Sequence, residues 1–101
     1  MKILVKEPNK EFEVRIVRNE LAALQAVVGG YIEAVHQTRP DLVMICNEEG
    51  LLKHLPVNRL LGYQFVGTVF FCGSKGDKFI SLTPDDITYL KAQDKMTGLG
   101  V

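Results

Sequence analysis

The chain has 101 residues, which is enough for one domain and too few for two. Hydrophobic residues make up 47% of it and charged residues 24%, as in an ordinary soluble globule. Twelve Lys and Arg balance twelve Asp and Glu, and this zero net charge argues against a DNA-binding protein, a protein that binds an anionic membrane and an acidic DNA mimic.

The two cysteines, Cys46 and Cys72, each lie inside an apolar run. Two buried thiols in a domain with an ordinary core are typical of the reducing cytoplasm and not of a disulfide framework. Residues 1–7 resemble neither a signal peptide nor a membrane span, and no apolar run approaches the ~20 residues that a membrane helix needs. We therefore expect a cytoplasmic protein that does not insert into a membrane.

The first thirty residues predict a hairpin and a helix. Residues 2–7 and 11–17 are two short strands, and the Pro-Asn-Lys sequence at 8–10 favours a turn between them. Asn19 is a suitable N-cap for the helix that follows, and the two glycines at 29–30 end that helix.

The middle of the chain predicts three strands and one short helical turn. Residues 31–37 alternate between two faces, whereas residues 42–46 are apolar on both faces and predict a covered central strand. Pro56 excludes a long helix from the next segment, so we expect a short helical turn that begins near Leu55. Residues 65–73 predict a second strand that is apolar on both faces and is interrupted by a glycine.

The last quarter of the chain predicts a hairpin strand and a helix. Residues 78–82 form the strand after a turn at 74–77. Thr83 then supplies a capping hydroxyl, followed by a proline and two acids, which is the clearest helix start in the sequence. The helix is expected to end at about residue 94, and residues 95–101 are predicted to be a flexible tail.

Together these elements predict one small α+β domain over residues 1–94. Hairpins alternate with helices instead of following a strict βαβα order, which favours a mixed or mostly antiparallel sheet of about five to six strands with two helices. The residues expected to form the helix-facing core are Leu21, Leu24, Val28, Leu42, Met44, Val66, Val69 and Ile87.

A polar group after the most apolar strand is the candidate site. Asn47, Glu48 and Glu49 follow that strand directly, and Asn58 and Arg59 come later, on the predicted helical turn. A glutamate can accept two hydrogen bonds from a guanine edge, an asparagine can read an adenine edge, and the arginine fork suits phosphate or carboxylate. The alternatives are a polar loop that leads to a glycine, and a surface ion pair between Arg59 and one glutamate.

Aromatic residues offer stacking, but the sequence has no catalytic or metal-binding pattern. Tyr63 or Phe70 can stack on a base if a face of the sheet is open. The two cysteines and the histidines His36 and His54 lack the spacing of a metal site, and there is no nucleophile–base pair or cofactor fingerprint. The sequence therefore predicts a binding protein that is not an enzyme and needs neither metal nor cofactor.

Three segments in fixed order carry a family resemblance: GGYIE (29–33), LVMICNEEGLLKHLPVNR (42–59) and GTVFFCG (67–73). Most of the chain resembles the family called domain of unknown function 3846, which is typical of bacteriophages, plasmids and their hosts. The resemblance implies a phage or mobile-element origin but no established chemistry. Small phage proteins without catalytic residues often act against host defence, and one such group, the sponges, traps nucleotide-derived immune signals between subunits.

The expected function is therefore the capture of a cyclic oligonucleotide or an ADP-ribose type signal by a homo-oligomer, without catalysis. The expected ligand-binding residues are Asn47, Glu48, Glu49, Asn58, Arg59, Tyr31, Phe70 and Thr68. Arg59 would hold phosphate, and Tyr31 or Phe70 would stack on the base. One alternative is a protein–protein inhibitor of a host defence or transcription enzyme, and another is an enzyme that degrades the same signals.

Overall fold

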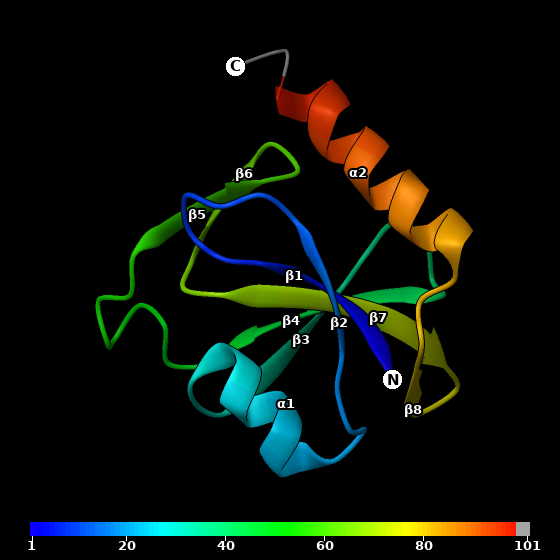
Figure 1. Cartoon of the computed structure of the whole chain (residues 1–101). Helices are drawn as coiled ribbons and strands as arrows, with labels where there is room; N and C mark the ends of the chain where they lie inside the picture. The colour runs from blue at the N-terminus through cyan, green and yellow to red at the C-terminus, as the bar shows by residue number, and fades with distance from the viewer. Residues whose placement is uncertain (99–101) are drawn as a thin grey trace.

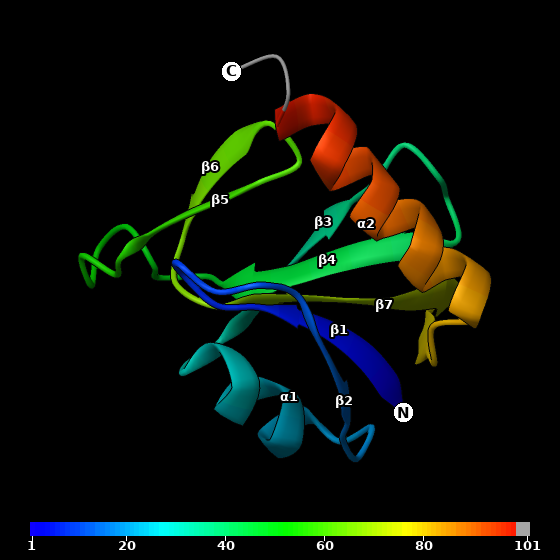
Figure 2. The same ribbon diagram turned by 45° about the horizontal axis from the view of Figure 1, so that its top comes forward.

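A six-stranded sheet with a helix on each side forms the centre of the computed structural model, which describes residues 1–98 (Figures 1 and 2). The strands are β1 (Lys2–Lys6), β2 (Glu13–Ile16), β3 (Ile32–His36), β4 (Leu42–Asn47), β5 (Val57–Leu60), β6 (Tyr63–Val66), β7 (Val69–Lys75) and β8 (Lys78–Ile80). The helices are α1 (Leu21–Val28) and α2 (Pro84–Gly98). The paired strands are antiparallel, so the predicted α+β class is confirmed.

Strand β7 is the middle of the main sheet, whose order is β2-β1-β7-β4-β3 with β8 also paired to β7. Strand β4 lies along one edge of β7, while β1 and β8 follow one another along the other edge. Because helices cover both faces here, β4 and β7 bury consecutive residues, as their apolar sequences predicted.

The sheet has a separate core on each face, because successive side chains of a strand point in opposite directions. The face toward α1 buries Ile3, Val5, Leu24, Val28, Val43, Ile45, Phe70 and Cys72. The face toward α2 buries Leu4, Leu42, Met44, Leu60, Val69, Phe71, Leu82 and Leu90. The prediction of Leu21 as a core residue is wrong: it is 59% exposed, and only Leu24 and Val28 of α1 are buried. Val66 and Ile87 are half-buried.

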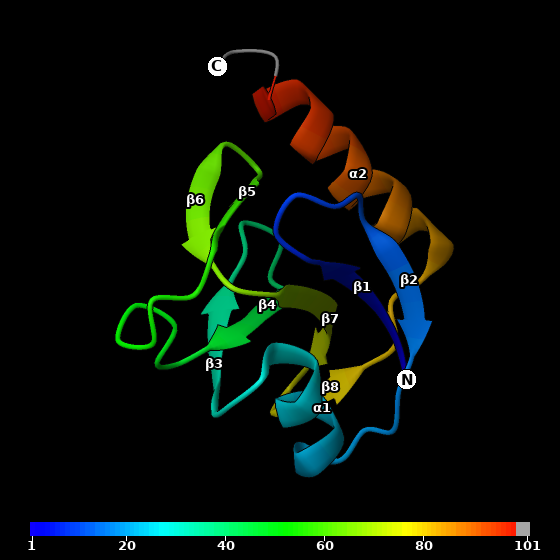
Figure 3. The same cartoon turned by 60° about the vertical axis from the view of Figure 1, so that its left-hand side comes forward.

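Strands β5 and β6 form a separate two-stranded ribbon, which Figure 3 shows beside the main sheet. The predicted helical turn near Leu55 is wrong, because residues 57–60 are extended and pair with residues 63–66. Gly67 has a φ of +76° and lets the chain leave the ribbon and enter β7. A Cβ on Gly67 would stand 2.7 Å from Cδ1 of Leu55. The predicted strand 65–73 is therefore divided into two strands.

The two helices begin differently. The Asp86 backbone N–H donates to Thr83 Oγ1 (3.1 Å), and Asp86 Oδ2 accepts from the Thr83 N–H (2.9 Å), so the predicted start of α2 is confirmed as a reciprocal cap. The predicted N-cap of α1 is wrong, because Glu20 occupies that position and makes no side-chain cap bond. Asn19 instead donates from Nδ2 to the Phe79 carbonyl (2.9 Å), a tertiary contact with β8.

The end of α1 follows the prediction, whereas the end of α2 does not. Gly29 closes α1 in the left-handed region with a φ of +80°, as predicted. Helix α2 runs to Gly98, beyond the predicted end at residue 94, so residues 95–98 are helical and not part of a tail. The rest of the predicted tail, residues 99–101, lies outside the described residues. Within residues 1–98, no helix is both long enough and apolar enough to cross a membrane.

Candidate functional site

Asn47, predicted to read a base, is buried at the end of β4. Its Nδ2 donates to the Val28 carbonyl (3.2 Å), and its Oδ1 accepts from the Glu49 backbone N–H (2.8 Å). The first bond reaches the end of α1 and the second shapes the turn after β4. The side chain therefore fixes a turn and presents little surface to a ligand.

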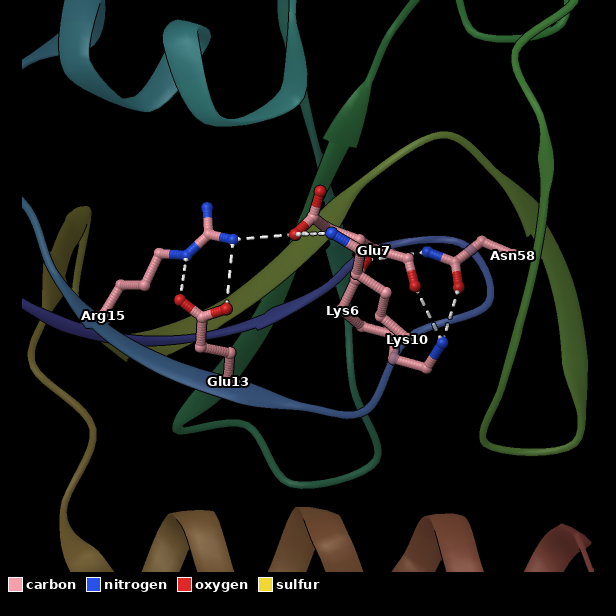
Figure 4. A network of polar contacts seen from close by, with 6 residues as sticks. All are labelled: Lys6, Glu7, Lys10, Glu13, Arg15 and Asn58. Atoms are coloured by element: carbon pink, nitrogen blue, oxygen red, sulfur yellow. Dashed lines mark hydrogen bonds and ion pairs between the residues drawn. The ribbon is translucent and has the colours of Figure 1, made fainter.

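Asn58 is fully buried and also belongs to the fold. Its Nδ2 donates to the carbonyls of Lys6 and Gly67, both at 2.8 Å, and its Oδ1 accepts from Lys6 Nζ at 3.2 Å. Both amide hydrogens are used, and the oxygen has one partner. The predicted base-reading role of Asn58 is not compatible with this placement, because the amide instead ties β5 to the end of β1 (Figure 4).

The charged residues of the predicted site lie in two different places. Glu48 and Glu49 line an open depression with Tyr31, whereas Arg59 lines another hollow with Lys6. Within residues 1–98, no ion pair within 4.0 Å joins Arg59 to either glutamate. The structure therefore does not bring the predicted residues into one shared hollow, and it does not form the alternative ion pair.

The two remaining predicted contacts lie near the centre of the chain. Phe70 is fully buried in the core toward α1, so its predicted role in stacking on a base is wrong for this structure. Thr68 is half-buried in the segment that links β6 to β7. Sequence pattern alone could not place Phe70, because both faces of β7 are apolar.

The cysteines are small apolar side chains here. Burial raises the pKa of Cys72 to about 12, and burial together with the nearby Glu33 carboxylate raises the pKa of Cys46. Neither environment favours the thiolate that a nucleophile or metal ligand requires. In the described part of the chain, no three His, Cys, Asp or Glu side chains form a group that could hold a metal ion.

A cleft lies on the α2 side of the sheet, between the edge strand β3, the β5–β6 ribbon and α2. It has a volume of about 450 Å³. Its lining residues are Val35, His36, Gln37, Thr38, Leu61, Tyr63, Phe65, Tyr89, Leu90, Gln93 and Thr97. We call this the α2 cleft. Its lining combines three aromatic rings with amide, hydroxyl and imidazole groups.

A hydrogen bond joins two walls of the α2 cleft, and two aromatic rings line one of them. Asp94 Oδ1 accepts from the Leu61 N–H (2.7 Å) and so joins α2 to the tip of the ribbon. The rings of Tyr63 and Phe65 lie 6.4 Å apart between centroids with an interplanar angle of 58°, which leaves their faces unstacked on each other.

Arg39 packs against Tyr89, one of the residues that line the α2 cleft. Its guanidinium lies 4.6 Å from the centroid of the Tyr89 ring and donates to Asp41 (2.8 Å) and to Asp86 (2.7 Å). The hydrogen bond from Arg39 lowers the pKa of the Asp41 carboxyl, and bonds to the two carboxylates raise the pKa of the guanidinium. This network orients Tyr89 in the first half of α2.

The α2 cleft was not predicted, because its residues come from three distant segments of the chain. Tyr63 was already a candidate for stacking on a base, but nothing in the sequence marked Gln93 or Thr97 as a ligand-binding residue. The amphipathic pattern of α2 does not distinguish a side chain that lines a cleft from one that lies in the core.

Comparisons with known proteins identify the family and nothing finer. The family described as "Domain of unknown function (DUF3846)" matches residues 1–95. Neither a curated protein nor a solved structure matches the chain. Because the match covers residues 1–95 of 101, the chain belongs to this family, as the three sequence segments predicted.

Proposed function

We propose that this protein is a phage-type counter-defence protein that captures a nucleotide-derived immune signal in the α2 cleft and does not transform it. The observation that carries the proposal is the lining of the cleft, which among the described residues has aromatic rings and polar groups but no Asp, Glu, Lys or Arg side chain. Such a lining suits an uncharged, planar base with hydrogen-bonding edges. Its volume of about 450 Å³ lies within the range of small-molecule sites.

Each lining group has a distinct task in this proposal. Tyr63 and Phe65 offer ring faces on which a base can stack. Gln93 presents an amide that both donates and accepts, and Thr97 and His36 add further donors and acceptors around the base edge. The expected ligand class remains a cyclic oligonucleotide or an ADP-ribose type molecule.

The proposal includes a homo-oligomer, because one copy leaves the cleft open on its solvent side. Exposed apolar side chains on two other parts of the molecule support it: Ile16 on the edge strand β2 is 71% exposed, and Leu51 and Leu52 protrude from the turn before β5. Burying such side chains against a second copy is favourable. Light scattering on the purified protein measures the particle mass, and a monomer at every concentration would contradict this part.

A thermal-shift screen of cyclic di- and trinucleotides and ADP-ribose derivatives tests the proposal. At about 100 times the dissociation constant, a ligand of the native state stabilises it by about 2.7 kcal/mol. Tyr63→Ala should remove most of that stabilisation. Tyr31→Ala is the matched control, because Tyr31 is similarly exposed (63% against 70%) but lies by Glu48 and Glu49. If Tyr31→Ala alone removed the stabilisation, the ligand would bind at the depression and not in the α2 cleft.

The proposed absence of catalysis can be tested separately. A ligand released by heating the complex should be recovered chemically intact, as shown by mass spectrometry. Recovery of a cleaved product after prolonged incubation would instead indicate an enzyme that degrades the signal.

A second candidate is a protein–protein inhibitor of a host defence or transcription enzyme, favoured by the edge strand β2. Within the described part of the chain this strand pairs with β1 alone, and it carries Val14 and Ile16 as exposed apolar side chains. Exposed strand edges can add a strand from another protein. This candidate predicts no stabilisation by any nucleotide, a stably co-purified host protein and loss of that protein in Ile16→Lys.

A further inference from the structure

A hollow on the outer face of the β5–β6 ribbon has a composition unlike that of the α2 cleft. It has a volume of about 520 Å³ and is lined by Lys6, Asn9, Pro56, Val57, Arg59 and Gln64. Arg59 and Gln64 are cross-strand partners, so their side chains share one face of the ribbon. Tyr63 and Phe65 each pair with a neighbour of Arg59, and Phe65 lies on the opposite face, toward the α2 cleft. The ribbon therefore separates two sites.

Lys6 is an unusual member of this lining, because it is a charged side chain with only 9% exposure. Its Nζ donates to the Glu7 carbonyl (2.9 Å) and to Asn58 Oδ1 (3.2 Å), both of which are uncharged (Figure 4). Among residues 1–98, no ion pair within 4.0 Å involves Lys6. An ammonium has three donors, and burying its charge without a counter-ion is costly.

Two carboxylates of the β1–β2 hairpin, those of Glu7 and Glu13, are paired with other cations. Glu7 Oε2 accepts from Arg15 at 2.9 Å and lies 3.6 Å from Lys10, and Glu13 pairs with Arg15 at 2.8 Å. Figure 4 shows this chain of contacts running away from the Lys6 ammonium. Neither of these two carboxylates therefore forms an ion pair with the Lys6 ammonium.

The lining residues add a second positive charge and no negative one. Arg59 is exposed and contributes a guanidinium fork, while Asn9 and Gln64 contribute amides. Glu11, the remaining acid of the β1–β2 hairpin, is exposed and is not part of the lining. Two cations and two amides thus surround a space that has no counter-charge of its own.

We propose that this hollow binds the phosphate group of a small molecule, with Lys6 and Arg59 as its two charged contacts. A phosphate presents three or more oxygens and up to two negative charges, which match two cations and two amide donors. A carboxylate presents two oxygens and one charge, and would leave a cation uncompensated. The volume of about 520 Å³ exceeds that of a free phosphate ion and leaves room for an esterified group.

This site is independent of the α2 cleft, since the ribbon lies between them, and so the proposal does not depend on the proposed function. From the sequence, Arg59 was predicted to hold phosphate in a site that it shares with Glu48 and Glu49. The structure instead places Arg59 and Lys6 in the lining of the same hollow, whereas Glu48 and Glu49 line a different depression.

Titration of the ¹⁵N-labelled full-length protein with inorganic phosphate, followed by NMR, tests the site. Ionic strength is held constant with potassium chloride, because surface charge effects are screened by salt. We expect saturable shifts at the backbone amides of Lys6, Asn9, Arg59 and Gln64. Ribose 5-phosphate, titrated in parallel, separates a site for free phosphate from a site for a phosphate ester, and binding of either one supports the proposal.

Arg59→Gln is the main variant, because Arg59 is exposed and its replacement should leave the fold intact. It should weaken phosphate binding about tenfold or more, as the loss of a charge-assisted hydrogen bond does. Arg18→Gln is the matched control: Arg18 is also exposed and lies beyond Ile16, which pairs with Lys2 at the far end of β1. Lys6→Met should weaken binding similarly, and circular dichroism confirms that this variant folds.

Two results would overturn the proposal. One is a set of shifts that are linear in phosphate and unchanged in Arg59→Gln. The other is acetate binding at these amides that is as tight as phosphate binding, since two cations and two amides would then show no preference for the larger and more highly charged anion.

Discussion

On one face of the central sheet a single short helix, α1, covers the core, whereas on the other face α2 and the β5–β6 ribbon cover it together. The α1 face is closed by apolar packing around Phe70. The α2 face is closed by two pieces that meet through polar contacts, such as the bond from the Leu61 N–H to Asp94. The α2 cleft lies where these two pieces diverge. A layer made of two elements thus provides a site that one continuous layer does not.

The largest expected effect comes from Phe70→Ala. This side chain is fully buried, so its truncation should lower the free energy of unfolding by about 3–5 kcal/mol. Because Phe70 lies on the α1 face, stabilisation by a ligand of the α2 cleft should be unchanged. Urea denaturation with and without the ligand measures both quantities.

Leu90→Ala is the matched variant on the other face, since Leu90 is buried and also lines the α2 cleft. Leu90→Ala should lower the free energy of unfolding by about 2–5 kcal/mol, and it should also weaken ligand binding. If Phe70→Ala folded normally but lost the ligand, the two faces would not be functionally distinct.

The second largest effect is expected for Asn58→Ala. Two carbonyls and the Lys6 ammonium would lose a partner, and each unsatisfied buried group costs about 1–3 kcal/mol, so we expect a loss of about 2–4 kcal/mol after some water enters. The ribbon should also loosen, which native-state hydrogen exchange of residues 57–66 would detect.

Asn47→Ala serves as the control on the α1 side. It removes two hydrogen bonds at a turn and should cost about 1–2 kcal/mol without changing exchange in the ribbon. Equal loosening of the ribbon in both variants would mean that Asn58 does not anchor it specifically.

A smaller effect distinguishes the starts of the two helices. Thr83→Ala should lower stability by about 1 kcal/mol, because it removes one half of the reciprocal cap of α2. Glu20→Asn should raise stability by up to about 1 kcal/mol, because position 20 has an extended N-cap conformation but no side-chain cap bond. Thermal unfolding compares the two. A neutral result for Thr83→Ala would show that Asp86 and Arg39 hold this end without the hydroxyl.

The smallest effect concerns pH. The hydrogen bond from Arg39 lowers the pKa of Asp41 in the folded state, so the folded protein binds fewer protons at this site than the unfolded chain. The resulting stability is present above the unfolded pKa of about 4 and is lost as pH falls through the folded pKa. At a pH below that range, the Asp41→Asn variant and the parent protein should therefore have the same stability. Urea midpoints measured from neutral to acidic pH test this, and a gap that persists in acid would contradict it.

The sequence predicted those parts of the fold that depend on neighbouring residues. Gly29 ends α1 because glycine accepts a left-handed conformation, and Thr83 begins α2 because its hydroxyl reaches the third residue of the helix. It failed where the same residue types took part in tertiary contacts. Asn19 has the chemistry of an N-cap, but the carbonyl of Phe79 lies within reach and takes its amide.

The candidate site was less predictable than the fold. Asn47 and Asn58 stand in the sequence as polar residues near a strand end, and this position does not distinguish an amide that faces a ligand from one that satisfies buried carbonyls. Arg59 was expected on a helical turn, and its placement in an extended strand, where it lines the same hollow as Lys6, depends on the pairing of β5 with β6.

By itself, the sequence determined the α+β class, the two covered strands and two of the four helix ends, because periodicity and capping act between residues only a few positions apart. Only the tertiary structure decided which polar groups are buried, which cations lie together and where a cleft opens. Those outcomes depend on contacts such as Lys6 with Asn58 and Asp94 with Leu61, between residues that are distant in the chain. Their free energy depends on burial, which no local pattern records.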